Sequence, residues 1–73
     1  MDRTLAESAI KAFLAEIKQR LEEAAGIAKA SQVCAEGGNV NKAIEIVLDV
    51  EQLTYESANL LNAASTVNRI SKD

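Results

Sequence analysis

A pair of adjacent glycines, Gly37 and Gly38, constrains the fold of this chain more than any other feature. On each side lies a long run without proline, in which apolar side chains recur at helical spacing. Glycine adopts the left-handed conformation that ends helices, so Gly37 is expected to end one helix and Gly38 to permit the reversal. Asn39 or Asn41 can then cap a second helix. The sequence predicts a long antiparallel helical hairpin.

The predicted hairpin is a single all-α domain covering residues 1–73, with helices at about 4–36 and about 41–71 and a bend at 37–40. Thr4 and Glu7 have the spacing of a capping box at the first helix start. A break at Gly26 would give three helices instead, because glycine costs about 1 kcal/mol in a helix interior. No cap or proline surrounds Gly26, which favours the hairpin.

Each predicted helix carries a seam of apolar and small residues that alternate in steps of three and four. In the first helix, Phe13, Ile27 and Cys34 are expected to widen the seam. Large residues facing small ones along a seam allow two helices to interlock. The predicted seams are Ile10, Leu14, Ile17, Leu21, Ala24, Ala28, Ser31 and Ala35 in the first helix, and Ala43, Ile46, Val50, Leu53, Ser57, Leu60, Ala64 and Val67 in the second.

The second helix has more apolar residues than one seam can cover. Ile44, Leu48 and Tyr55 lie on another side, and burying each of them would contribute about 1.5–3 kcal/mol. A row of three such residues is typical of an interface rather than of scattered surface positions. We therefore expect Ile44, Leu48 and Tyr55 to form the interface of a homodimer, in which two hairpins make a four-helix bundle.

The chemistry of most enzymes and metal carriers is missing from the sequence. There is no histidine, which removes the usual proton carrier near neutral pH and a common metal ligand. Cys34 is the only cysteine, has no adjacent base and is expected in the core. The sequence predicts no enzyme activity, no cofactor and no metal. Without a spanning apolar stretch or a leader-like start, it also predicts a cytoplasmic protein without a membrane contact.

Charged residues form one acidic stripe and one basic grouping, in a chain of net charge −3. The stripe is expected to be a solvated face; a docking strip for a basic partner and a metal site made by two copies are its alternatives. The basic residues make RNA binding a further alternative, because the architecture resembles in outline small dimeric helical hairpins that bind RNA. The stripe is Glu45, Asp49, Gln52 and Glu56, and the basic grouping is Lys11, Lys18 and Arg20.

These patterns favour a non-enzymatic interaction module, a small adaptor or regulator that self-associates as a helical bundle. The alternative is a small chaperone or subunit that binds an amphipathic helix of another protein. The position of the bend also predicts the register of the hairpin. Arg20 and Glu56 should face each other across it, so that their charges meet beside the seam.

Overall fold

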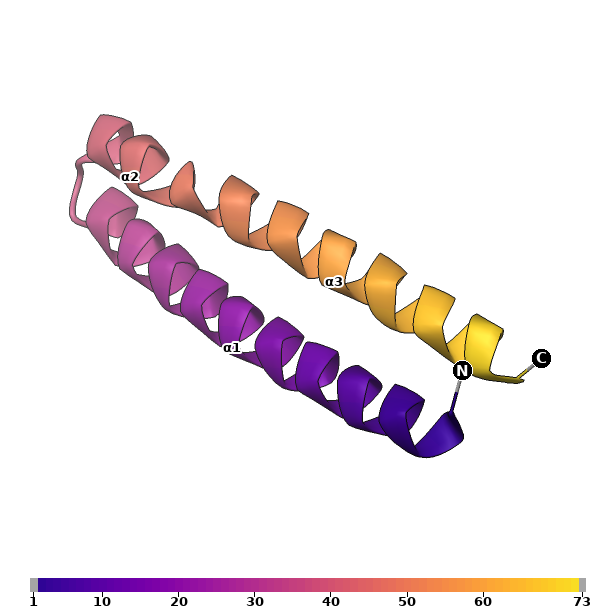
Figure 1. Ribbon diagram of the computed structural model, residues 1–73. Helices are drawn as coiled ribbons and strands as arrows, with labels where there is room; N and C mark the ends of the chain where they lie inside the picture. The colour runs from indigo at the N-terminus through magenta and orange to yellow at the C-terminus, as the bar shows by residue number, and fades with distance from the viewer. Residues whose placement is uncertain (1, 73) are drawn as a thin grey trace.

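The computed structural model describes residues 2–72, and this part of the chain is an all-α hairpin (Figure 1). Helix α1 runs from Arg3 to Glu36, α2 from Val40 to Val47 and α3 from Asp49 to Lys72. α1 lies antiparallel to α2 and α3, and the hairpin measures 54 × 14 × 11 Å. At the end of the hairpin opposite the bend, Arg3 links α1 to α3. Its Nη1 donates to Asn68 Oδ1 at 3.2 Å and to the hydroxyl of Ser71.

The start of α1 differs from the expected capping box. Asp2 is the N-cap, and its carboxylate accepts a hydrogen bond from the amide of Thr4 at 2.9 Å. Thr4 therefore lies inside the helix, and Glu7 pairs with Arg3 at 3.3 Å instead of capping. A carboxylate at this position satisfies an orphan amide and also complements the positive end of the helix dipole.

The bend is built by Gly37, Gly38 and Asn39. The left-handed conformation was expected at Gly37, but Gly37 has a negative φ of −76°, and the residue with positive φ, 98°, is Gly38. The amide of Asn39 donates to the carbonyl of Cys34 at 3.1 Å, which ties the bend back onto α1. Asn39 then caps α2, accepting from the amide of Lys42 at 3.1 Å, as one of the two predicted caps.

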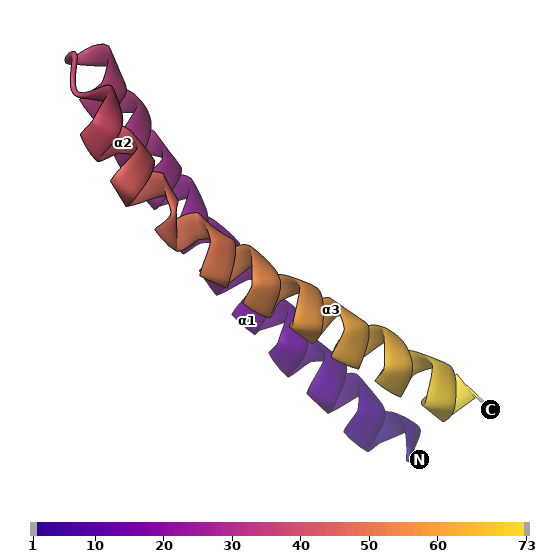
Figure 2. The same ribbon diagram turned by 90° about the horizontal axis from the view of Figure 1, so that it is seen from above.

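Helix continuity also differs from expectation at one place. α1 continues through Gly26, so the three-helix alternative with a break there is wrong. The expected single second helix is instead divided at Leu48, where the Glu51 amide donates to the Leu48 carbonyl three residues back, at 3.2 Å. A three-residue step winds the chain more tightly than an α-helix. Figure 2 shows this irregular turn between α2 and α3 and the curve that the hairpin makes there.

The seam of α2 and α3 consists of the eight predicted residues, all buried or half-buried. The seam of α1 is only partly as expected. Ile10, Ile17, Ala24 and Ser31 form one row of it, but the second row is Phe13, Arg20, Ile27 and Cys34. Leu14, Leu21 and Ala28, expected in that row, are exposed.

Arg20 explains why the α1 seam was misassigned. An arginine in the Phe13 row argues against that row being buried, whereas the neighbouring leucines argue for theirs. Arg20 is accommodated because its long side chain reaches out of the seam to carboxylates at the edge. Arg20, which makes the seam hard to recognise, is thus held by its contact with Glu56. The position of the bend correctly predicted this contact.

The core of the hairpin is made of small side chains. Within residues 2–72, no large side chain is fully buried. Ser31 is held by a hydrogen bond to the carbonyl of Ala43 at 2.6 Å, across the seam. The two helices therefore approach closely but cover little apolar area. The buried residues are Ala6, Ala24, Ala43 and Ala64, with Ser31 and Ser57.

Candidate interaction surface

The two sides of the seam differ in chemistry. One, the carboxylate side, presents Glu16, Glu23, Asp49, Gln52 and Glu56 around Arg20. Arg20 Nε donates to Glu56 Oε1 at 3.0 Å, and Nη1 bonds the Glu16 carboxylate and, at 3.3 Å, the Glu16 carbonyl. The predicted contact between Arg20 and Glu56 is confirmed. It fixes the register between α1 and α3 and joins the helices on this side.

The contacts of Arg20 and Glu56 shift the pKa of both groups toward their charged forms. Hydrogen bonds to Glu16 and then to Glu56 raise the pKa of Arg20, outweighing desolvation. The amide of Gln52 donates to the other Glu56 oxygen at 3.0 Å. This bond, followed by the one from Arg20, lowers the pKa of Glu56 below its ordinary value of 4.5. Arg20, Glu16, Gln52 and Glu56 therefore find their polar partners on the carboxylate side itself.

The acidic stripe predicted from sequence lies along this side, and its members are spread out rather than gathered. Glu45 contacts Lys42 at 3.4 Å on the same helix. In residues 2–72, no three His, Cys, Asp or Glu side chains come together in a way that could hold a metal ion. Arg20 is occupied with carboxylates, whereas Lys18 pairs with Glu22 at 3.9 Å. The basic grouping of Lys11, Lys18 and Arg20 is thus not a single free surface.

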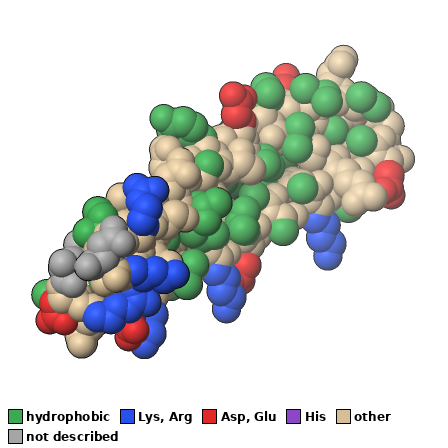
Figure 3. Space-filling model, turned by 90° about the vertical axis from the view of Figure 1, so that its right-hand side faces the viewer, with side chains coloured by type: hydrophobic (Ala, Val, Ile, Leu, Met, Phe, Trp, Pro, Cys, Tyr) green, Lys and Arg blue, Asp and Glu red, His purple; other side chains and the backbone are tan. Residues whose placement is uncertain are grey.

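The opposite side of the seam, which we name the leucine face, is apolar. Leu14 and Leu21 each follow the Phe13–Arg20 row by one residue, and Leu61 likewise follows the seam residue Leu60. In an antiparallel pair, the positions that follow the two seams lie on the same side. Figure 3 shows hydrophobic side chains gathered between the helices, with Lys or Arg along one border. The leucine face comprises Leu14, Leu21, Ala25, Ala28, Ile44, Val47, Ala58 and Leu61.

Much of this apolar area has no cover within the hairpin. The exposed fractions of Leu14, Leu21 and Leu61 are 52%, 48% and 56%. Full burial of a leucine contributes about 1.5–3 kcal/mol, so half-exposure of three leucines forfeits on the order of several kcal/mol. A contiguous apolar patch with polar borders is typical of an association surface. The leucine face is therefore the main candidate for one.

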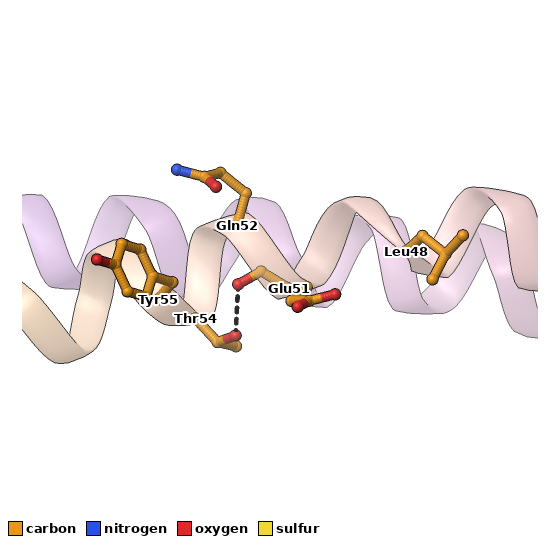
Figure 4. A pocket seen from close by; sticks show the side chains of 5 residues that line it. All are labelled: Leu48, Glu51, Gln52, Thr54 and Tyr55. Carbon is orange, nitrogen blue, oxygen red and sulfur yellow. Dashed lines mark hydrogen bonds between the residues drawn. The ribbon is translucent and has the colours of Figure 1, made fainter.

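The three residues predicted as an interface lie beside this face and behind it. Ile44, Leu48 and Tyr55 are 56%, 60% and 63% exposed. Ile44 belongs to the leucine face, whereas Leu48 and Tyr55 lie seven residues apart on the outer surface (Figure 4). Between them is a hollow of about 650 Å³ lined by Leu48, Glu51, Gln52, Thr54 and Tyr55. All five come from one continuous stretch of chain, so the hollow lacks the opposing wall of a ligand pocket.

Sequence reasoning did not single out Leu14, Leu21 and Leu61 as exposed. The sequence pattern places the first two in the seam, and it does not distinguish Leu61 from its seam neighbour Leu60. A signal was present: Leu14, Leu21 and Ala28 repeat every seven residues next to a second seven-residue row, Phe13, Arg20, Ile27 and Cys34. Together with the row from Ile10 to Ser31, these rows make an apolar stripe that is wider than the narrow seam between two helices.

Comparison with known proteins gave no matching family model, no matching curated protein and no matching solved structure. Within residues 2–72, none of the helices combines the length and the apolar character needed to cross a membrane. The geometry of the hairpin itself, above all its uncovered leucine face, is thus the basis on which a function can be proposed.

Proposed function

We propose that this chain is a non-enzymatic interaction module, an adaptor or regulator, whose hairpins pair into a four-helix bundle. The observation that carries the proposal is the leucine face, which gathers exposed apolar side chains from both helices on one side. In this proposal Ile44 contributes to the contact at the bend end of the leucine face, and Leu48 and Tyr55 extend the interface onto the outer surface of α2 and α3. The proposed setting is the cytoplasm, because a lone cysteine suits a reducing compartment.

The small core of the hairpin supports this proposal. A domain of this size has little apolar area to offset its conformational entropy. Here the buried seam residues are alanines and serines, whereas leucines of both helices lie outside it. Pairing would bury the leucines and add the stability that the single hairpin lacks.

A second candidate function is a small subunit that binds an amphipathic helix of another protein. The hollow between Leu48 and Tyr55 favours it, because an apolar side chain of a docked helix could enter there. In that case the partner would be a different chain, and the purified protein would stay monomeric or form no defined oligomer. The two functions therefore differ in what the purified chain does alone.

Sedimentation velocity and thermal melts over a hundredfold dilution series test the proposed function. Association favours the folded state by mass action, so Tm should rise with protein concentration and a discrete dimer should sediment. The carboxylate-side variant Gln19→Ala serves as a matched control and should behave as wild type. A monomer whose Tm does not depend on concentration would overturn the proposal.

A further inference from the structure

The leucine face is arranged in levels along the hairpin. A level here means the same height along the hairpin axis. The contact of Arg20 with Glu56 fixes the heights of the two helices. Leu21 follows Arg20 and Thr54 lies two residues before Glu56, so Leu21 and Thr54 share a level. Seven residues away toward the open end are Leu14 and Leu61, and seven residues toward the bend are Ala28 and Val47. At these three levels the side chains of α1 are large toward the open end and small toward the bend, and those of α3 and α2 change from Leu61 to Val47, with Ile44 beyond them.

A second copy of this chain complements that gradient if it is turned end for end. The level of Leu14 and Leu61 then faces Ala28 and Val47 of the second copy, so that large side chains meet small ones and interlock. The level of Leu21 faces itself across the two-fold axis. A copy in the same direction would instead set leucines against leucines and leave the small residues near the bend with a gap.

Charges beside Leu21 suit the same arrangement. Lys18 and Glu22 lie one turn apart on the border of the face and contact each other at 3.9 Å. When two α1 helices run antiparallel about Leu21, Lys18 of one copy comes within about one helical turn of Glu22 of the other. The border therefore brings opposite charges together near the axis. Such charges at the rim of an interface affect the orientation of the two copies more than their affinity.

The extent of the face also suits a second copy. The named levels run seven residues, about 10 Å at 1.5 Å per residue, in each direction from Leu21, so two copies turned end for end would cover each other's levels. We propose that the leucine face binds a second copy end for end, with the two-fold axis at Leu21. This inference rests on the proposed function and specifies its geometry.

Cysteine cross-linking tests the orientation. In a Cys34→Ser background, Leu21→Cys places two thiols next to each other at the axis, where a disulfide needs Cβ atoms about 3.5–4.5 Å apart. Under mild oxidation, disulfide-linked dimers should form at least about tenfold faster than with Ala15→Cys, which lies on the outer side of α1. A mixture of Leu14→Cys and Ala28→Cys chains should also cross-link, which gives a second measurement that does not alter Leu21.

The outcomes separate this inference from the proposed function. If the chain sediments as a dimer but neither cysteine design cross-links faster than Ala15→Cys, the end-for-end geometry is wrong and self-association stands. Efficient cross-linking of a mixture of Leu21→Cys and Thr54→Cys chains, with little from Leu21→Cys alone, would indicate copies in the same direction and overturn the proposal. A chain that is monomeric at all concentrations overturns both.

Discussion

The two sides of the hairpin flank the same seam but differ in whether their side chains have partners within one copy of the chain. On the carboxylate side, Arg20 contacts Glu16 and Glu56, and Gln52 completes the hydrogen bonding of Glu56. On the leucine face, Leu14, Leu21 and Leu61 are about half exposed and have no such internal partners. The central polar groups of one side are paired within a single copy, whereas the other side leaves apolar area uncovered.

This difference shows how a very short chain can separate two tasks. Contacts on the carboxylate side set which residues of α1 lie opposite which residues of α3, because Arg20 and Glu56 meet in only one register. The leucine face then receives side chains from both helices at matched levels. Fixing the register on one side is thus a condition for a continuous surface on the other.

Leu21→Glu should weaken self-association more than the other substitutions, because it places a charge in the middle of the apolar side. Leu21 is about half exposed in one hairpin, so each of the two positions in a dimer loses about half of the roughly 1.5–3 kcal/mol of full leucine burial and also places a carboxylate in the contact. The dissociation constant should therefore rise by about a hundredfold or more. Analytical ultracentrifugation measures the shift. Ala15→Glu, on the outer side of α1, is the matched control and should leave association unchanged. Unaltered sedimentation of Leu21→Glu would remove the leucine face from the interface.

Leu48→Glu should weaken association by a smaller factor, about tenfold, while the helical content remains. Leu48 lies on the outer surface of the α2–α3 junction, where a carboxylate stays partly hydrated and its cost is reduced. Sedimentation and circular dichroism of the same sample check both parts. If the variant sediments as wild type, Leu48 is a solvent-facing residue and the predicted interface does not extend to it.

Glu56→Gln should have the smallest effect, and it acts on the carboxylate side. Because the folded-state pKa of Glu56 is lowered, its contribution to stability is present above the unfolded value of 4.5 and is lost as the pH falls through the folded value. The Tm difference between wild type and Glu56→Gln should be a few degrees at neutral pH and shrink below about pH 4.5. A difference that is constant down to pH 2 would show that this ionisation does not stabilise the fold.

The sequence predicted the hairpin because its strongest signals agree with each other. The glycine pair ends α1, Asn39 caps α2, and every predicted seam residue from Ala43 to Val67 is buried or half-buried. The bend position also predicted the contact of Arg20 with Glu56, since a fixed bend determines which positions face each other. Here local preference and tertiary packing favour the same structure.

The sequence was less informative where tertiary contacts outweigh local preference. A charged residue in the Phe13 row concealed the true seam of α1, because the carboxylates that stabilise Arg20 come partly from α3. The break at Leu48 has neither glycine nor proline to mark it, and the half-buried Ile46 and Val50 preserve the seam across it. The candidate surface was predicted only at Ile44, Leu48 and Tyr55, because the exposure of Leu21 depends on that same seam.

The conformation of Gly38 has a consequence for the chemistry of the bend. Its φ of 98° excludes ordinary side chains, yet a Cβ added there would meet no atom within 4 Å. The restriction therefore comes from chirality and not from lack of space. L-amino acids rarely adopt this backbone conformation, whereas D-amino acids adopt it readily. A D-amino acid at this position could carry a side chain, a label or a linker into open solvent without disturbing either helix.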